Sequence, residues 1–224
     1  MSDDHPDHDH HHDHAPGAPH RHPPREDDDV ALTPAEAKFL ALKSLLIEKG
    51  VLTADEIRQR HEINDRGTPH QGARMVAKAW LDPTFKARML EDGKAAAKEL
   101  GIEVTEADLM VIENTPKCHN LIVCTLCSCY PRSLLGEPPA WYVSKAYRSR
   151  AVREPRKVLR EFGLVIPEAV EVRVHDSNAD LRYIVLPMRP NGTEDLSEAQ
   201  LADLVSRDCL VGAALPGKPS GATA

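Results

Sequence analysis

The cysteines constrain this chain more than any other feature of its sequence. Four of the five, Cys118, Cys124, Cys127 and Cys129, fall within twelve residues, and Cys209 stands alone. An odd number of tightly clustered cysteines does not suit a disulfide framework, in which paired cysteines are spread over a small secreted domain. The clustering instead predicts a metal site or redox chemistry at residues 118–129.

The spacing within residues 124–129, whose sequence is CTLCSC, favours an unusual coordination geometry. A metal bound by the sulfurs of Cys127 and Cys129 lies close to the backbone nitrogens of Ser128 and Cys129, because small chelate rings join these four atoms. Cys124 can supply a fifth ligand, which leaves one position open. Such a square of sulfur and nitrogen suits cobalt(III) or iron(III) rather than tetrahedral zinc. The ion would then act as a Lewis acid on the molecule in the open position. A zinc site completed by His119 is the alternative use of the same thiols.

Charge and polarity are uneven along the chain. Residues 1–29 hold nine acidic and two basic side chains and eight of the twelve histidines, so they account for the whole net charge of −7. This segment is predicted to be a disordered tail, with either loose metal capture or no role in the chemistry. The neutral remainder lacks the basic excess that nucleic-acid binding needs.

The sequence also excludes a membrane protein. No apolar run approaches the roughly 18 residues of a membrane span. The acidic start of the chain contains no apolar segment, which predicts that there is no secretory signal and that the protein is cytoplasmic.

Helix signals dominate the first part of the ordered chain. Capping boxes at 33–36 and 53–56 predict helices over 33–49 and 53–63, with a loop over 64–72 after them. Further helices are predicted over 73–81 and 83–100. Helices are also expected at 139–149, 154–162 and 198–205.

Strand signals begin after Gly101. Short apolar runs at 109–113 and 121–123 predict buried strands, and alternating segments near 170–174 and 181–185 predict an antiparallel pair. The fold class is therefore predicted to be α+β. The expected organisation is a disordered tail over 1–29, a helical N-terminal arm over 30–101, a mixed α/β domain over 102–215 with the metal-claw loop after a strand, and a flexible C-terminal tail over 216–224.

The cysteine segment also resembles a known family. CTLCSC is similar to the metal-binding motif of nitrile hydratase α subunits, and the likeness extends over roughly residues 74–215. Thr125 and Tyr130 match the cobalt type of the family, whereas the iron type usually has Ser and Thr there. Five further segments carry the resemblance: MVAKAWLDP (75–83), VIENTP (111–116), LLGEPPAWY (134–142), YRSRAVREPRKVL (147–159) and RYIVLPMRPNGTE (182–194).

The resemblance implies a set of roles for these residues. Cys127 would be oxidised to sulfinic acid and Cys129 to sulfenic acid, while Cys124 would remain a thiolate. Ser128 and Cys129 would each give a backbone nitrogen to one non-corrin cobalt(III) ion, with iron(III) less favoured. The implied partners are a β subunit, in a heterodimer or heterotetramer, and a cobalt-insertion activator protein. Arginines of the β subunit would pair with the oxidised sulfurs.

The implied activity is that of a lyase, the hydration of a nitrile to its amide. The oxygen on Cys129 would attack the nitrile carbon or activate a water, and Tyr130 and Arg132 are candidates for the substrate pocket. Arg132 and Cys209 resemble instead the γ subunit of thiocyanate hydrolase, which converts thiocyanate to carbonyl sulfide and ammonia. An arginine near the metal would favour such an anionic substrate. A non-catalytic metal-binding subunit is the third alternative.

Overall fold

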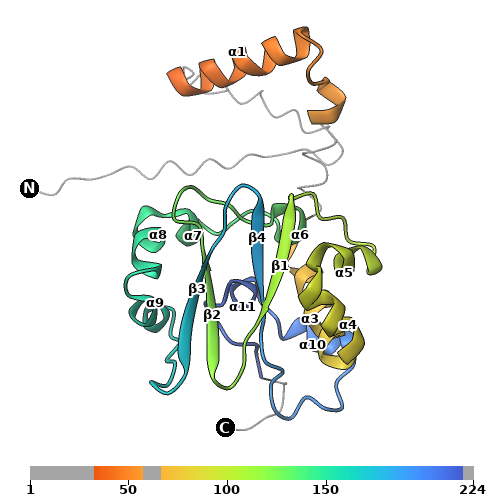
Figure 1. The fold of residues 1–224 in the computed structure, drawn as a ribbon, viewed down its shortest axis with the longest axis vertical. Helices are drawn as coiled ribbons and strands as arrows, with labels where there is room; N and C mark the ends of the chain where they lie inside the picture. Colours follow the sequence, from red (N-terminus) through yellow and green to blue (C-terminus); the bar gives the residue numbers. More distant parts are fainter. Residues whose placement is uncertain (1–32, 58–66, 219–224) are drawn as a thin grey trace, which may run out of the picture. The chain divides into compact units, whose positions relative to one another are not determined.

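The computed structural model describes residues 33–57 and 67–218 (Figure 1). The predicted tail over 1–29 lies outside the described residues, as do the later part of the predicted helix over 53–63 and the last residues of the predicted C-terminal tail. The backbone forms two compact units, Met1–Val51 and Leu52–Ala224. Each unit is described by itself.

The first unit contains one helix, α1 (Pro34–Glu48), among its described residues. Its predicted capping box is confirmed: the Thr33 backbone N–H donates to a Glu36 carboxylate oxygen at 2.7 Å, and the Glu36 N–H donates to Thr33 Oγ1 at 3.3 Å. Pro34 stands in the first turn, where no backbone donor is needed. No residue of α1 is buried, and the Phe39 side chain is 66% exposed.

Four strands organise the second unit: β1 (Asp108–Glu113), β2 (Cys118–Val123), β3 (Glu171–Asp176) and β4 (Leu181–Leu186). β1 pairs with β4 and β2 with β3, and both pairs are parallel. Figure 1 shows the strands side by side in the order β3, β2, β4, β1, and β2 contacts β4. The predicted α+β class is confirmed.

The predicted antiparallel pairing of the last two strands is wrong. β3 and β4 do run in opposite directions, but each forms its hydrogen bonds with an earlier strand. Alternating polarity identifies a strand without naming its partner. β2 is buried at all but its first position and therefore takes a central place between β3 and β4, while the more exposed β3 lies at the edge.

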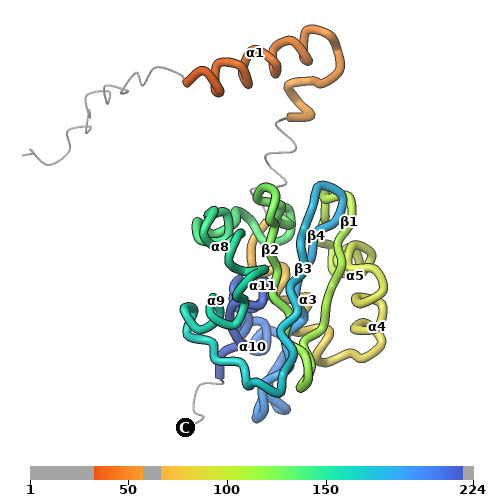
Figure 2. The backbone as a smooth tube through the Cα atoms, turned by 60° about the vertical axis from the view of Figure 1, so that its left-hand side comes forward, coloured from red at the N-terminus to blue at the C-terminus, as the bar shows by residue number. Residues whose placement is uncertain are grey.

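Short helices cover the strands. α4 and α5 pack against β1, α8 against β2, α9 against β3, and α11 against β2 and β4, while α3 contacts α4, α6, α10 and α11 (Figure 2). Among the described residues, no helix is both long and apolar enough to cross a bilayer. Their bounds are α3 (Pro69–Leu81), α4 (Pro83–Glu91), α5 (Gly93–Glu99), α6 (Arg132–Leu135), α7 (Ala140–Val143), α8 (Lys145–Ala151), α9 (Pro155–Glu161), α10 (Glu198–Asp203) and α11 (Arg207–Val211).

Several helices differ from the sequence-based prediction. α3 begins at Pro69, inside the predicted loop over 64–72, because proline suits the first helical turn. The helix predicted over 83–100 is divided at Asp92, where the backbone is extended. The Asp92 side chain caps α5 by accepting a hydrogen bond from the Ala95 N–H at 2.9 Å. Helices α6 and α11 were not predicted, and the helix predicted over 139–149 is divided at Ser144 into α7 and α8. Because α3, α4 and α5 share the second unit with the strands, that unit begins well before residue 102, where the change from helices to strands was expected to mark a boundary.

Candidate metal centre

The cysteine loop, residues 124–129, follows directly on the last residue of β2. Its first turn is fastened to the end of the neighbouring strand β3 by Asp176, which accepts hydrogen bonds from the Thr125 backbone N–H at 2.9 Å and from the Thr125 hydroxyl at 2.5 Å. β1 and β4 run in the opposite direction to β2 and β3, so their first residues lie at the end of the strands where β2 and β3 finish (Figure 1). The loop is therefore held at one end of the strands.

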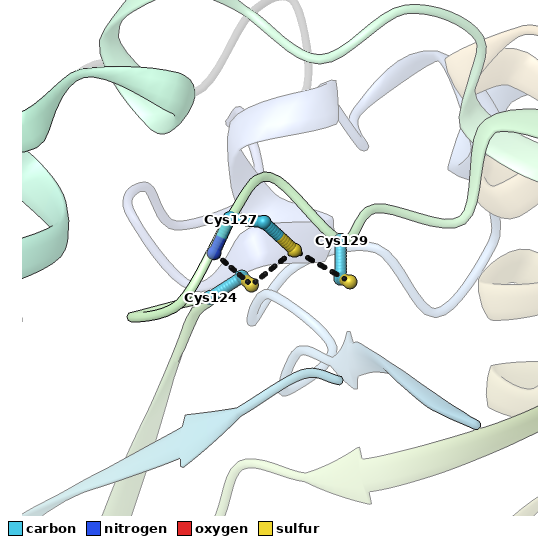
Figure 3. Close-up of side chains that lie close together, drawn as sticks. All are labelled: Cys124, Cys127 and Cys129. Carbon is cyan, nitrogen blue, oxygen red and sulfur yellow. Dashed lines mark hydrogen bonds between the residues drawn. The ribbon is translucent and has the colours of Figure 1, made fainter. Parts of the chain in front are cut away.

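Three sulfur atoms converge in this loop (Figure 3). The Sγ atoms of Cys124 and Cys127 lie 3.4 Å apart, and those of Cys127 and Cys129 lie 3.1 Å apart. All three lie within 4.8 Å of one another, close enough to share one ion, and they are the only such group of cysteine, histidine or carboxylate ligands among the described residues. Cys124 is buried and Cys127 exposed, so the cluster joins the core to the surface.

Backbone nitrogens face the same point. The backbone N–H groups of Ser128 and Cys129 help to lower the pKa of the Cys127 thiol, and the Cys127 N–H donates to the Cys124 sulfur at 3.3 Å. The sulfurs required by the claw hypothesis therefore lie together, and the Ser128 and Cys129 amides that it also requires adjoin Cys127 in the chain. Thiolate and nitrogen donors suit a transition-metal ion rather than magnesium or calcium.

The thiols of Cys127 and Cys129 differ in pKa. A hydrogen bond from Cys129, assisted by one from Cys124, lowers the pKa of Cys127 to about 7. Burial, and the loss of that proton-donating contact on ionisation, raise the pKa of Cys129 to about 12, against the positive charge of Arg182. The two groups titrate as a coupled pair, with the first proton leaving Cys127.

Side chains from α7 and α8 hold the carbonyl oxygens of this region. The Tyr142 hydroxyl donates to the Cys129 carbonyl at 2.9 Å, and the Arg148 guanidinium donates to the Cys127 carbonyl. The Tyr147 hydroxyl donates to the Ile122 carbonyl at 2.6 Å, at the end of β2. No local sequence pattern marks Arg148 as a residue that turns inward.

A cavity of about 550 Å³ opens beside the loop, and both predicted pocket residues line it. Tyr130 is buried and packs edge-on against Tyr142 with ring centroids 5.1 Å apart, while its hydroxyl has no hydrogen-bond partner among the described residues. Arg132 pairs with both Glu137 carboxylate oxygens, at 2.8 and 2.6 Å, so its charge is largely offset. The lining is Thr105, Glu106, Ala107, Cys127, Ser128, Cys129, Tyr130, Arg132, Ala179 and Arg182.

Arg182 is the residue of this cavity that sequence reasoning missed. It is the second residue of β4, and its Nε and Nη1 atoms are buried without a hydrogen-bond partner in the described part of the chain. A guanidinium left in this state is costly unless a ligand or partner supplies an anion. An arginine between the apolar residues of a short strand was the available signal.

The zinc alternative is not supported by the position of His119. One ring nitrogen of this buried histidine lies 2.7 Å from the Gly212 carbonyl and the other lies 3.3 Å from the Asn114 amide nitrogen, so neither faces the thiols. Cys209 is buried 3.2 Å from the Ser206 hydroxyl, which fits a packed thiol. Cys118 contacts Asn120 and is likewise outside the cluster.

The fold and the site together define a class of chain, in which a short loop after a parallel strand brings three cysteine sulfurs close enough to share one ion. A sequence model of the family described as "Nitrile hydratase, alpha chain" matches residues 33–214. The chain belongs to the nitrile hydratase α-chain family.

Individual relatives agree with this assignment. The low-molecular-weight cobalt-containing nitrile hydratase subunit α of Rhodococcus rhodochrous is 48% identical over 89% of this chain and 95% of that protein. The thiocyanate hydrolase subunit γ of Thiobacillus thioparus is 47% identical over 79% of this chain and 78% of that protein. The solved structure of a recombinant thiocyanate hydrolase with partially modified cobalt centres matches with a TM-score of 0.76 and 44% identity, over 84% of this chain and 92% of that one.

Proposed function

We propose that this chain is the α subunit of a cobalt-dependent nitrile hydratase, which adds water to a nitrile to form the amide. The observation that carries the proposal is the convergence of the Cys124, Cys127 and Cys129 sulfurs in a chain of this family. The likeness to a cobalt-containing nitrile hydratase over almost its whole length supports both the reaction and the metal. Iron(III) is the less favoured ion.

The proposed ligands are the three sulfurs and the backbone nitrogens of Ser128 and Cys129. When bound, the ion supplies Lewis-acid polarisation of the nitrile carbon. Cys127 is proposed to be a sulfinic acid and Cys129 a sulfenic acid, the products of stepwise thiolate oxidation. Both oxidations need an external oxidant of the dioxygen or peroxide class.

Cys129 is the proposed catalytic residue. Its sulfenate oxygen attacks the nitrile carbon or takes a proton from the water that attacks it. Arg182, on the same cavity wall, is placed to offset negative charge on Cys129. Burial raises the pKa of Tyr130, which keeps its phenol protonated as a hydrogen-bond donor to the substrate, and Arg132 lies at the same cavity.

The proposed partners follow from the family and the surface. A β subunit would form a heterodimer or heterotetramer with this chain, and an activator protein would insert the cobalt. Leu126, at the tip of the cysteine loop, is 85% exposed, and an apolar side chain in this position favours cover by another chain. A cytoplasmic location remains part of the proposal.

Thiocyanate hydrolysis is the second candidate function. It is favoured by the two arginines at the cavity, Arg132 and Arg182, and by the likeness to a thiocyanate hydrolase subunit γ. The Glu137 carboxylate weighs against it, because it neutralises Arg132 and leaves a single uncompensated cation for an anionic substrate.

The test uses the chain co-expressed with its β subunit in cobalt-supplemented medium. We expect cobalt by elemental analysis, conversion of acetonitrile to acetamide, and a peptide spanning Cys124–Cys129 that carries two added oxygen atoms on Cys127 and one on Cys129. The Cys129→Ser variant should lose the activity. Faster release of ammonia from thiocyanate than hydration of acetonitrile would establish the second function. A cobalt-loaded complex that converts neither substrate would identify a non-catalytic metal-binding subunit.

A further inference from the structure

Arg148 is the only cation that the described structure places on the backbone of the cysteine loop. It lies in α8 and donates to the Cys127 carbonyl oxygen. Its Nε is buried without a hydrogen-bond partner, and no carboxylate of the described residues forms an ion pair with it. Arg150, on the same helix, is instead paired with Glu154 and Glu161. The charge of Arg148 is therefore not cancelled within the described chain.

The carbonyl that Arg148 contacts belongs to the peptide between Cys127 and Ser128. The nitrogen of that same peptide is the proposed Ser128 ligand, so this inference rests on the proposed function. An ion held by that nitrogen would take the place of its proton, which would pass to solvent. The negative charge left on the peptide is shared between nitrogen and the Cys127 carbonyl oxygen, because the amide is conjugated. A cation that donates to this oxygen stabilises the charged peptide.

We propose that Arg148 is the counter-charge of the metal claw, a positioning residue that stabilises the Cys127–Ser128 peptide in its metal-binding form through the Cys127 carbonyl oxygen. This role requires the positive charge of the guanidinium as well as its hydrogen bond to the carbonyl oxygen. An uncharged donor of similar reach would fix the loop and leave the peptide charge uncompensated.

Tyr142, in α7, can be compared with Arg148, because it contacts a different carbonyl of the same loop. Its neutral hydroxyl donates to the Cys129 carbonyl at 2.9 Å. That carbonyl belongs to the peptide between Cys129 and Tyr130, whose nitrogen is not among the proposed ligands. Tyr142 therefore holds the shape of the loop without facing a charged peptide. Removal of the Tyr142 hydroxyl and removal of the Arg148 charge should have different effects on metal binding.

The test compares four variants of the chain, each co-expressed with the β subunit over a series of cobalt concentrations: Arg148→Gln, Arg148→Lys, Tyr142→Phe and Arg153→Gln. Arg153 is the matched control, because it also donates to a backbone carbonyl, that of Ser149, and no described hydrogen bond joins it to the loop. The readout is the cobalt concentration that gives half-loading, measured by elemental analysis of the purified complex. Thermal unfolding of each complex checks that the variants fold.

Arg148→Gln should need roughly tenfold more cobalt for half-loading, the effect of losing a hydrogen bond to a charged group. Arg148→Lys should recover most of this loss, Tyr142→Phe should show a smaller increase, and Arg153→Gln should match the unchanged chain. In the loaded Arg148→Gln complex, the sulfur-to-cobalt absorption band should move to shorter wavelength, because an uncompensated nitrogen donates more strongly to the ion. Tyr142→Phe should leave the band in place.

Two results would overturn the role of Arg148: unchanged half-loading in a folded Arg148→Gln complex, or equal losses in Arg148→Gln and Tyr142→Phe with no movement of the band. Failure of the proposed function has a different signature. The unchanged chain would then take up no cobalt at any concentration, or would load fully and leave both acetonitrile and thiocyanate unchanged.

Discussion

At the residue scale, the cavity beside the cysteine loop contains one arginine whose charge is offset and one whose charge is not. Arg132 is paired with Glu137, whereas two nitrogens of Arg182 are buried without a partner among the described residues. Keeping a guanidinium in this state costs stability, so its retention is best explained by an anion that it meets in the working protein. In the proposed enzyme that anion is the oxidised Cys129.

Replacement of Arg182 should therefore separate function from stability. We expect Arg182→Gln to lower kcat/KM for acetonitrile by roughly tenfold or more, because the positive charge proposed to offset the oxidised Cys129 is lost. The urea midpoint should not fall, because the removed charge has no partner to leave behind. The control is Arg173→Gln, which removes an exposed arginine paired with Glu171 on β3. A lower urea midpoint with unchanged kcat/KM would show that Arg182 is structural.

Gly212 marks a second point where one residue decides the packing. Its φ is +85°, and a Cβ atom added to it would overlap the Asn120 carbonyl oxygen of β2. Gly212→Ala should lower the free energy of unfolding by at least about 3 kcal/mol, since backbone strain adds to a clash with a strand that cannot move. The measurement is urea unfolding.

Gly163 is the matched control for this substitution. It has a similar φ of +80°, but nothing lies within 4 Å of the position that an added methyl group would occupy. Gly163→Ala should cost only about 1 kcal/mol, the strain of the left-handed backbone alone. Equal losses in the two variants would mean that the approach of α11 to β2 does not limit the packing.

At the element scale, the helix boundaries show which parts of this fold are encoded locally. The capping box at Thr33 located the start of α1, because a capping box is complete within four residues, and the structure shows another at Ser197, where α10 was expected to begin. The break at Asp92 could not be predicted in this way. It depends on Gly93, where a Cβ would lie 2.5 Å from the Leu109 carbonyl of β1, a contact between residues that are distant in sequence.

The same distinction applies to strands and site. The apolar runs located β1 and β2. The pairing of the strands could not be predicted in the same way, because it depends on how buried each strand is relative to the others, and the sequence of one strand does not contain that information. The three thiols were found because they share one short loop. Asp176 and Arg148 reach that loop from 51 and 21 residues away in the chain, and only the packed strands and helices bring them there.

A polar network joins β2 to its neighbours and should make stability depend on pH. His119 of β2 contacts the Gly212 carbonyl after α11, and His175 of β3 lies 2.9 Å from the Asn120 side-chain oxygen. Burial lowers the pKa of both histidines below the usual 6.5, with Arg173 also acting on His175. The unfolded chain then binds more protons than the folded one as the pH falls through 6.5.

Stability should accordingly be complete above about pH 6.5 and should decline as the pH falls toward the lowered folded pKa values. We expect the urea midpoint to be lower at about pH 5.5 than at about pH 7.5, a window above the usual titration range of the carboxylates. His175→Gln should reduce this difference, because one of the groups that titrate in this window is removed. A midpoint that does not change over this window would show that the histidines are protonated equally in both states.

At the scale of the whole molecule, the buried apolar residues belong to the second unit, whereas the N-terminal helix is exposed to solvent. All the buried apolar residues among those described lie between Ala73 and Ala213, in the second compact unit. α1 has no buried residue, although Phe39, Leu42 and Leu45 give it apolar side chains. Within its own unit α1 buries none of these side chains, and exposed apolar side chains on a helix favour contact with a partner chain.

Deletion of residues 1–51 tests this division of roles. The remaining chain, 52–224, should have a free energy of unfolding within about 0.5 kcal/mol of the full chain, because no buried side chain is removed. Its recovery in a complex with the β subunit should fall, because Phe39, Leu42 and Leu45 are lost as apolar contacts. The matched control removes only residues 1–29 and keeps α1, and should assemble as the full chain does. If the 52–224 chain assembled equally well, α1 would not contribute to the interface, and if it failed to fold, the second unit would depend on the first.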